Sequence, residues 1–359
     1  MTYERSHIAR MSGYVSGTQP GEGAIKLNTN ENPWPPSPRV MACLAGLTSR
    51  SLQRYPDPLA SDFRLAAARR HGLLPDQVIA TNGGDELLRL VLTTFVDPGR
   101  PVGVAAPSYG VYSVLAGIHR APVSVVALTD AWQLPDDAAD HWNSDGAQLV
   151  ILTNPHAPSG KLEPIDAIDR LASALQGVLL IDEAYVDFVD PARSHVATKL
   201  IERHPNLLLL RTLSKGYSLA GLRLGYGLGD AALIAPMLGK TKDSYNVDAI
   251  AQTLGTVALD DGDHASASWQ YVRDQRQLLA LAIAELGFEV GASEANFLLV
   301  SVPVAPGWRD ARDLHAKLER RRIYVRWFDE DRLRGRLRIS IGTFEENQAL
   351  ISVIKALRG

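Results

Sequence analysis

The chain has 359 residues, of which 46% are hydrophobic and 21% are charged, and its formal net charge at pH 7 is −3. This length predicts about two domains, and the balance of hydrophobic and charged residues excludes a disordered chain. The near-neutral charge argues against a nucleic-acid partner. No apolar run approaches the roughly 18 residues of a membrane helix, and the N-terminal stretch lacks the apolar region of a secretory signal. Because the single cysteine, Cys43, cannot form an internal disulfide, we expect a cytoplasmic protein without a membrane partner.

The first forty residues are rich in Gly, Pro and Asn, which predicts an arm over the surface before a first helix near Ser37. From about residue 78 to 212, short apolar stretches alternate with amphipathic helical patterns such as 87–95 and 165–175. This rhythm predicts α/β architecture, with a mostly parallel sheet flanked by helices. The predicted strands are 78–81, 102–106, 124–128, 148–153, 178–181 and 207–211.

After about residue 247 the pattern changes to a long helical segment, 268–286, followed by alternating short strands and helices. We interpret this part as a second, smaller α+β domain. The predicted division is an arm with part of the small domain at 1–40, a large domain at 41–247 and the small domain at 248–359. In the strand predicted at 337–342, alternation puts Arg338 on the face opposite the apolar side chains.

The stretch RTLSKGYSLAGLRLGY, residues 211–226, follows a strongly apolar strand. It places Thr212, Ser214, Lys215 and Arg223 at the carboxyl end of that strand, where open α/β sheets bind ligands. A lysine beside an arginine and two hydroxyls can bind phosphate, and a lysine near another cation has a lowered pKa suited to Schiff-base chemistry. The alternative is that Lys215 is a solvated loop lysine, but the position of Lys215 directly after a buried strand argues against this alternative.

Three more polar stretches follow predicted strands: TNGGDE at 81–86, TNPHAPSG at 153–160 and IDEAY at 181–185. The glycines of the first suit a phosphate at a helix N-terminus, and the second is a rigid turn. The acidic pair of the third could bind magnesium or cap a helix, and for the pair alone capping is favoured. Because all these stretches fall at the same end of one sheet, they predict a ligand site together.

Two other patterns carry less weight. Gly227, Gly229 and Ala232 match the GxGxxA form of the dinucleotide motif, but they come late in the βα series, so an NAD-dependent oxidoreductase is a remote alternative. The histidines show no HExxH pattern and one cysteine cannot make a thiolate zinc site, so we expect no metal site.

Eight motifs resemble, in order, those of the histidinol-phosphate aminotransferase group of pyridoxal-phosphate enzymes, within the fold type I aminotransferases. They are LNTNENPW at 27–34, RYPDP at 54–58, GGDE at 83–86, APSYGVYS at 106–113, TNPHAPSG, LLIDEAY at 179–185, TLSKGYSLAGLRLGY and RLRISIGT at 336–343. The resemblance implies a transaminase that converts L-histidinol phosphate and 2-oxoglutarate into imidazole-acetol phosphate and L-glutamate, in histidine biosynthesis. An aromatic amino acid transaminase and a threonine-phosphate decarboxylase are alternatives within the same family.

The resemblance assigns catalytic roles to three residues. Lys215 forms the Schiff base with the cofactor, pyridoxal 5′-phosphate, and moves the proton from the substrate's Cα. Asp182 pairs with the pyridine nitrogen, and Tyr109 stacks on the ring. Asn154 and Tyr185 are implied as donors to the ring's 3′ oxygen.

The resemblance also implies the phosphate contacts of the cofactor. They map to Gly84, Asp85, Ser214, Arg223 and Thr212, with Tyr55 from a neighbouring subunit. Each active site of a homodimer would then be completed by the partner chain.

For the substrates, a small amino donor and a 2-oxo acid acceptor, Arg338 matches the arginine that holds a carboxylate or phosphate by a bidentate pair. Tyr14 and Tyr245 match tyrosines that hold the substrate's phosphate, with Tyr245 from the partner chain, and Asn154 is expected to face the substrate as well. The turn TNPHAPSG departs from the NPNNPTG more usual in the family, because His156 and Ala157 replace two asparagines. His156 is either a turn residue, which we favour, or a substrate-side donor.

Overall fold

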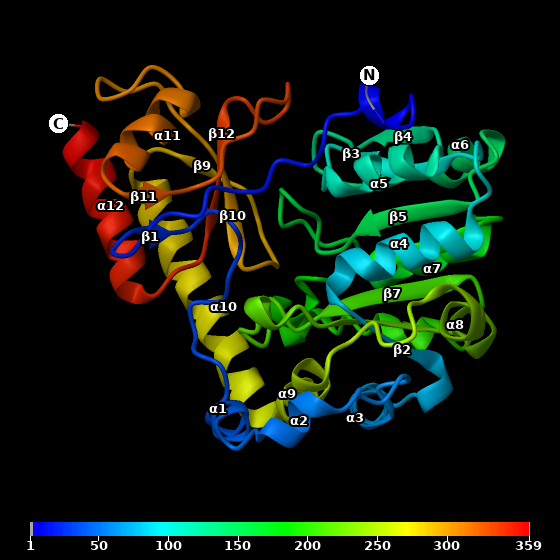
Figure 1. Ribbon diagram of the computed structural model, residues 1–359. Helices are drawn as coiled ribbons and strands as arrows, with labels where there is room; N and C mark the ends of the chain where they lie inside the picture. The colour runs from blue at the N-terminus through cyan, green and yellow to red at the C-terminus, as the bar shows by residue number, and fades with distance from the viewer. Residues whose placement is uncertain (1–2, 359) are drawn as a thin grey trace.

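The computed structural model describes residues 3–358 and contains one large sheet, with a smaller α+β part beside it (Figure 1). The strand order of the large sheet is β2-β8-β7-β6-β5-β3-β4. Neighbours from β7 to β4 pair in parallel, whereas β8 is antiparallel to both β2 and β7. The strands are β2 (Val78–Thr81), β3 (Val102–Ala106), β4 (Val123–Ala127), β5 (Leu149–Thr153), β6 (Val178–Asp182), β7 (Leu207–Thr212) and β8 (Gly225–Gly229). The predicted α/β class with a mostly parallel sheet is confirmed.

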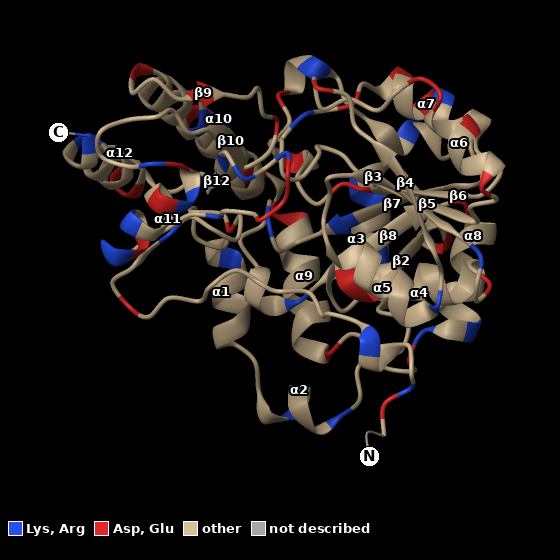
Figure 2. Cartoon of the chain, turned by 90° about the horizontal axis from the view of Figure 1, so that it is seen from above, with Lys and Arg blue, Asp and Glu red and all other residues tan. Residues whose placement is uncertain are grey.

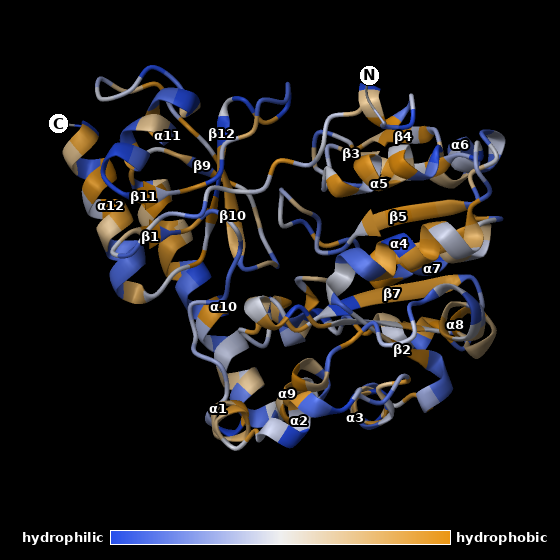
Figure 3. Ribbon diagram, viewed as in Figure 1, coloured by the Kyte–Doolittle hydropathy of each residue, from blue (hydrophilic) through white to orange (hydrophobic). Residues whose placement is uncertain are grey.

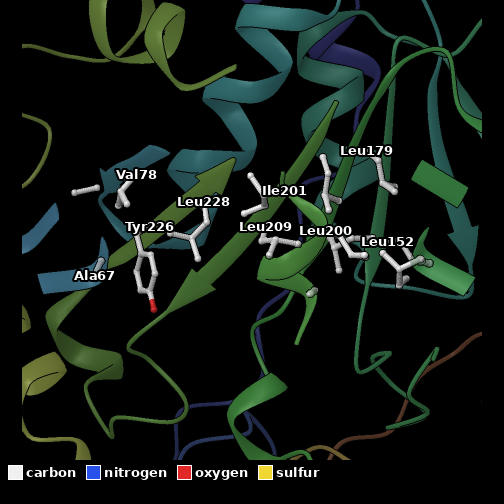
Figure 4. Packing of buried hydrophobic residues seen from close by; sticks show 14 of the residues in the cluster. Ala67, Val78, Leu152, Leu179, Leu200, Ile201, Leu209, Tyr226 and Leu228 are labelled. Atoms are coloured by element: carbon white, nitrogen blue, oxygen red, sulfur yellow. The ribbon is translucent and has the colours of Figure 1, made fainter. Parts of the chain in front are cut away.

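The central strands are continuously apolar because helices cover both faces of the sheet (Figure 3). Leu152, Leu179, Leu209 and Leu228 lie side by side in this core and are at most 2% exposed (Figure 4). Each such leucine contributes about 1.5–3 kcal/mol when it is fully buried. All six predicted strands are present, with ends within one residue of the prediction.

Strand β8 was not predicted, because its sequence GYGLG is poor in strand-forming residues. Its glycines allow close packing: a Cβ on Gly227 would lie 3.0 Å from side-chain carbons of Ile79 and Leu87. Gly227 is therefore in the middle of an antiparallel strand rather than in a turn that opens a helix. The geometry rejects the dinucleotide reading of GxGxxA.

The helices pack on the large sheet and within the smaller part. The first predicted helix is present, and the Ser37 side chain accepts a hydrogen bond from Arg39 N at its start. The long helix predicted at 268–286 begins earlier, at Gly262. The helices are α1 (Pro38–Ala45), α2 (Ser49–Gln53), α3 (Ser61–His71), α4 (Gly83–Phe95), α5 (Val111–His119), α6 (Ala138–Ser144), α7 (Ile165–Ala174), α8 (Ala231–Pro236), α9 (Ala249–Asp260), α10 (Gly262–Glu285), α11 (Ala311–Arg320) and α12 (Phe344–Arg358).

The smaller part holds an antiparallel sheet of β12 (Arg336–Ser340), β10 (Phe297–Ser301) and β9 (Glu289–Val290). The arm joins it, because β1 (Ile25–Lys26) pairs in parallel with β11 (Ile323–Tyr324). Apolar side chains of α10, α11 and α12 form a separate core over this sheet. Helix α9 instead packs against α1 and α3 and shares the core of the large sheet.

Acidic and basic side chains are interspersed along the chain (Figure 2). Within residues 3–358, no helix is both long enough and apolar enough to cross a membrane.

Candidate active site

A cavity of about 560 Å³ opens at the carboxyl ends of β6 and β7 and is closed on the other side by the arm and the smaller part. It collects most of the predicted site residues: Tyr14, Gly84, Asp85, Tyr109, Asp182, Tyr185, Thr212, Ser214, Lys215, Arg223 and Arg338. Asn154, Tyr55 and Tyr245 do not line it. Among residues 3–358, no three His, Cys, Asp or Glu side chains are grouped so that they could hold a metal ion.

Lys215 follows β7 and extends across the cavity to the arm, where its Nζ donates a hydrogen bond to Thr29 O at 2.8 Å. Burial, reinforced by the positive charge of Arg338, lowers the pKa of Lys215 to about 8. A much larger fraction of this amine is therefore neutral at physiological pH than for an ordinary lysine. Neutral amines are nucleophiles and bases, which is the chemistry expected of this position.

Asp182 ends β6 and is only 5% exposed. Burial raises its pKa to about 6, although its Oδ2 accepts a hydrogen bond from Tyr112 at 2.6 Å and its Oδ1 accepts one from Ala184 N at 3.0 Å. Both bonds favour the ionised form and oppose the effect of burial. Tyr112 is not among the residues predicted from the sequence, where its only signal is its place in APSYGVYS.

An anion cradle forms where α4 begins. Gly83 has φ +73°, and a Cβ there would lie 2.7 Å from Nη2 of Arg223, so the close approach requires glycine. Nη1 of Arg223 donates to Ser214 Oγ at 3.3 Å. The free N–H groups of the helix start, one hydroxyl and one guanidinium thus converge beside Gly84, a combination that binds phosphate.

The hydroxyl of Thr212 stabilises the loop that carries Ser214 of this cradle. It accepts a hydrogen bond from Ser214 N at 3.1 Å and lies 3.3 Å from Leu224 O, to which it donates. Thr212 therefore shapes the loop that presents Ser214, and its hydroxyl proton is already engaged.

Three tyrosines form an aromatic wall. The rings of Tyr14 and Tyr109 meet edge to face with centroids 5.3 Å apart, and Tyr185 packs edge-on against Phe297 at 5.0 Å. The Tyr185 hydroxyl accepts a hydrogen bond from Asn30 Nδ2 at 3.0 Å. Burial raises the pKa of both Tyr109 and Tyr185, so both hydroxyls keep their protons.

Arg338 on β12 faces the cavity with its guanidinium carbon 5.3 Å from the ring centre of Phe297 and 5.4 Å from that of Phe328. One Nη donates to Asn28 O at 2.9 Å, and among residues 3–358 its buried Nε has no hydrogen-bond partner. Burial lowers the pKa of this guanidinium, which nevertheless stays charged. An unpartnered donor of this kind is available to an anionic ligand.

Arg326, which is not among the residues predicted from the sequence, also lines the cavity. A two-residue backbone bridge joins it to Arg338, with N to O distances of 2.9 and 2.8 Å in the two directions. Both residues line the cavity, and the Arg326 guanidinium donates hydrogen bonds to Val15 O at 3.0 Å and Ser16 O at 3.4 Å of the arm. The only local signal for it is the alternation of buried Ile323 and Val325 with Tyr324 and Arg326, which continues past β11 (Ile323–Tyr324).

Asn154 does not line the cavity, and its expected contact with the cofactor ring stays a prediction. This residue is fully buried, its Nδ2 donates to Glu163 O at 3.1 Å, and its Oδ1 accepts from Glu163 N at 2.9 Å. The amide therefore closes the TNPHAPSG loop, and its Nδ2 also lies 3.5 Å from His195 Nε2. Ala157 and Pro158 are the residues of this turn that line the cavity.

His156 is buried and ties this turn to a neighbouring loop. Its Nε2 lies 2.8 Å from Pro107 O, which can only accept, so Nε2 carries the proton and Nδ1 accepts from Ser159 Oγ at 2.7 Å. Burial lowers the pKa of His156 to about 4, which keeps the ring neutral. The structure supports the turn role rather than the substrate-side donor, because His156 does not line the cavity.

Tyr55 and Tyr245 lie on the surface, where their rings stack with centroids 4.4 Å apart. They are 80% and 46% exposed. Their expected contribution to a partner's cavity stays a prediction.

The family model described as aminotransferase class I and II matches residues 22–354. A histidinol-phosphate aminotransferase from Trichormus variabilis is 40% identical over 357 residues, which cover 99% of each chain. One from Geotalea uraniireducens is 38% identical over 355 residues, with 98% of this chain and 99% of that chain covered.

Solved structures agree in fold. Histidinol-phosphate aminotransferase from Sinorhizobium meliloti, in complex with pyridoxal-5′-phosphate, has a TM-score of 0.90 at 24% identity and covers 99% of each chain. A putative aminotransferase from Burkholderia pseudomallei has a TM-score of 0.79 at 29% identity, over 94% of this chain and 100% of that chain.

Proposed function

The chain belongs to the class I and II aminotransferase family, and on this premise we propose that it transfers the amino group of L-histidinol phosphate to 2-oxoglutarate with pyridoxal 5′-phosphate as cofactor. The products are imidazole-acetol phosphate and L-glutamate. The observation that carries this proposal is the layout of the cavity: an anion cradle at one end, paired arginines at the other, and a lysine of lowered pKa between them. The similarity over the whole chain to histidinol-phosphate aminotransferases supports the choice of substrate.

The residues of the cavity fit the cofactor. The start of α4 with Gly84, Ser214 and Arg223 suits its phosphate, and Asp182 and Lys215 suit the ring nitrogen and the carbonyl carbon. When bound, pyridoxal phosphate takes up the amino group and draws electrons from the substrate's Cα. Glycine at 83 also lets Arg223 lie against the start of α4, because a Cβ at this position would be 2.7 Å from Nη2 of Arg223.

Lys215 and Asp182 then have complementary proton-handling roles. The Nζ of Lys215, with a pKa near 8, accepts and returns a proton at the reacting carbon. Asp182, held in its ionised form by two hydrogen bonds, keeps a proton on the ring nitrogen that it faces. Tyr185 supplies a protonated hydroxyl beside the ring, and Tyr109 supplies an aromatic face.

The arginine pair explains how one cavity accepts two different substrates. Histidinol phosphate presents a phosphate, whereas 2-oxoglutarate and glutamate present carboxylates, and both kinds of anion accept bidentate hydrogen bonds from a guanidinium. Arg338 and Arg326, with Tyr14 beside them, form one anion site that serves both half-reactions.

We further propose a homodimer in which the stacked Tyr55 and Tyr245 of one chain face the cavity of the other. Their exposure supports an intermolecular contact, because a pair of stacked aromatic rings is seldom left in water. The cytoplasmic location stays a prediction.

The test is a spectrum of the purified, cofactor-loaded enzyme. Histidinol phosphate should shift the cofactor's absorbance to the amino form, and 2-oxoglutarate should restore it. Borohydride reduction before substrate is added should attach a pyridoxyl group to Lys215, as seen by mass spectrometry, and Lys215→Ala should abolish both signals. No shift with histidinol phosphate but rapid turnover of phenylalanine would favour an aromatic transaminase, and carbon dioxide release from threonine phosphate would favour the decarboxylase.

A further inference from the structure

Tyr112 connects Asp182 to the neighbouring strand through a buried chain of hydrogen bonds. It lies in the first turn of α5 and is 1% exposed, and its hydroxyl is 2.6 Å from Asp182 Oδ2 and 2.7 Å from Thr153 Oγ1. Thr153 and Asp182 end β5 and β6 and are paired in register, so the parallel sheet itself brings their side chains together.

The direction of this chain follows from the chemistry of its groups. An ionised carboxylate can only accept hydrogen bonds, so the single phenolic proton of Tyr112 points to Asp182. The tyrosine oxygen is then free to accept the proton of Thr153. Each bond polarises the next, so the chain as a whole favours negative charge on Asp182.

Asp182 needs this support because its other surroundings favour the neutral acid. Besides burial, two negative charges raise the pKa of Asp182. They belong to Asp85 at the start of α4 and to Glu183, which follows Asp182 in the sequence. Glu183 is partly compensated by Arg211, whose Nε lies 2.7 Å from its carboxylate. The remaining titratable groups of the cavity wall nearby are Tyr109 and Tyr185, both protonated, and Lys215.

We propose that Tyr112 is a positioning residue that keeps Asp182 ionised and fixes the orientation of its carboxylate, the group that would hold the cofactor's ring nitrogen. Its role rests on the proposed function, but it acts on Asp182 whether or not the cofactor is bound. The Tyr112 ring also packs edge-on against Tyr109, with centroids 5.4 Å apart. Phenylalanine would keep that packing and remove only the hydroxyl, so Tyr112→Phe isolates the hydrogen bond.

The experiment measures the carboxyl titration of Asp182 in the cofactor-free protein. Difference infrared spectra against pH report the protonated carboxyl, and the band of Asp182 is the one missing in Asp182→Asn. We expect Tyr112→Phe to raise the midpoint by about one pH unit, the size expected for one hydrogen bond to a charged group. Affinity for pyridoxal phosphate at pH 7 should fall about tenfold in the same variant.

Tyr226→Phe is the matched control. Tyr226 is 2% exposed on the same sheet, its hydroxyl is 2.9 Å from His71 Nε2, and it does not line the cavity. This variant should keep the wild-type midpoint and affinity. In an Asp182→Asn background, Tyr112→Phe should cause no further loss of affinity, because the group through which it acts is gone.

An unchanged midpoint in Tyr112→Phe overturns the proposal, as does an equal loss of affinity in the Asp182→Asn background. If Tyr112→Phe does not fold, Thr153→Val removes the donor to Tyr112 and should move the midpoint upward by a smaller amount. An unchanged midpoint there also overturns the proposal. Failure of the wild type to bind pyridoxal phosphate would instead contradict the proposed function, since the titration of the free protein does not depend on it.

Discussion

Lys215 controls the chemistry of the cavity through its charge, because only the neutral amine acts as nucleophile or base. Burial and Arg338 lower its pKa to about 8, so the neutral form should dominate above that pH and decline below it. We predict that labelling of Lys215 in the cofactor-free protein by an amine-directed reagent reaches half its maximal rate near pH 8. Mass spectrometry of the labelled peptide provides the measurement.

The matched variant for this titration is Arg338→Ala. Removing the second cause of the shift should move the midpoint of Lys215 labelling to higher pH. A wild-type midpoint near the ordinary lysine value of about 10.4 would contradict the prediction.

Arg338 should matter equally to both half-reactions, because phosphate and carboxylate share its guanidinium. We predict that Arg338→Ala lowers kcat/KM for histidinol phosphate and for 2-oxoglutarate each by about a hundredfold, the cost of losing a charge-assisted bidentate pair. Stopped-flow measurement of each half-reaction checks this.

Arg338→Lys should recover only part of the loss, because an ammonium keeps the charge without the fork of donors. Cofactor affinity should change little in either variant, since the cradle lies at the other end of the cavity. A loss confined to one substrate would mean that the two anions bind at different places.

The start of α4 offers a sharper test, because its geometry requires glycine for two separate reasons. Gly83→Ala adds a Cβ at φ +73° and places it 2.7 Å from Arg223. We predict a cost of about 1 kcal/mol in stability from the backbone strain and, in addition, a fall in affinity for pyridoxal phosphate, because Arg223 must move. Thermal unfolding and cofactor titration separate the two effects.

Gly99→Ala is its control. Gly99 has φ +89°, but no atom of residues 3–358 lies within 4 Å of a Cβ at that position, apart from its own chain neighbours. The control should therefore show the strain without the loss of cofactor affinity. Equal affinity loss in both variants would show that strain, and not the displacement of Arg223, is responsible.

The TNPHAPSG turn should make the stability of the protein sensitive to acid. His156 has a pKa of about 4 when folded and about 6.5 when unfolded, so the unfolded chain binds the extra proton between these values. The contribution of neutral His156 to the free energy of unfolding is therefore fully present above pH 6.5. It is lost as the pH falls, by about 3 kcal/mol at pH 4. His156→Asn, which cannot titrate, should be less stable at neutral pH but should lose less on acidification. Urea unfolding at several pH values gives the slope of the unfolding free energy against pH for the wild type and for the variant. Equal slopes would contradict the prediction.

The strands could be predicted from the sequence because a strand that is buried on both faces has a continuous run of apolar residues. The direction of side chains within turns could not be predicted. Nothing local distinguishes Asn154, which bonds back to Glu163, from Ala157, which lines the cavity. Tyr112 and Arg326 were missed for a related reason, because their roles depend on strand pairing and a backbone bridge between segments distant in sequence.

The assembly of the whole chain places the cavity between two hydrophobic cores, with the arm crossing from one to the other (Figure 1). The predicted domain boundaries at residues 40 and 247 stay a prediction. The packing of α9 on α1 and α3 favours a later boundary, inside α10, since Ala265 belongs to the large core and Val272 to the small one. Arg332 links the two parts, donating to Leu128 O at 2.6 Å and Thr129 O at 2.8 Å.

If the active sites are shared across a dimer, two inactive chains should complement each other. Lys215→Ala removes the reacting amine, and Tyr55→Phe removes the hydroxyl expected to reach the partner's cofactor phosphate. In a mixed dimer, one cavity combines the intact Lys215 of one chain with the intact Tyr55 of the other, while the second cavity carries both defects. Random mixing makes half of the dimers hybrid, so activity should recover to about a quarter of the wild-type value.

The comparison that decides is between this mixture and a mixture of Tyr55→Phe with a double variant that carries both changes, because the two mixtures then differ only in the Tyr55 that the partner supplies to the intact Lys215. The second mixture has no cavity with both groups intact and should stay inactive. Subunits are exchanged by mild denaturation and refolding, and hybrids are isolated with a tag on one chain before assay. Equal activity of the two kinds of isolated hybrid would place Tyr55 in the same chain's site, if both are inactive, or outside the chemistry, if both are active, because the two-fold symmetry of a shared site leaves no other arrangement.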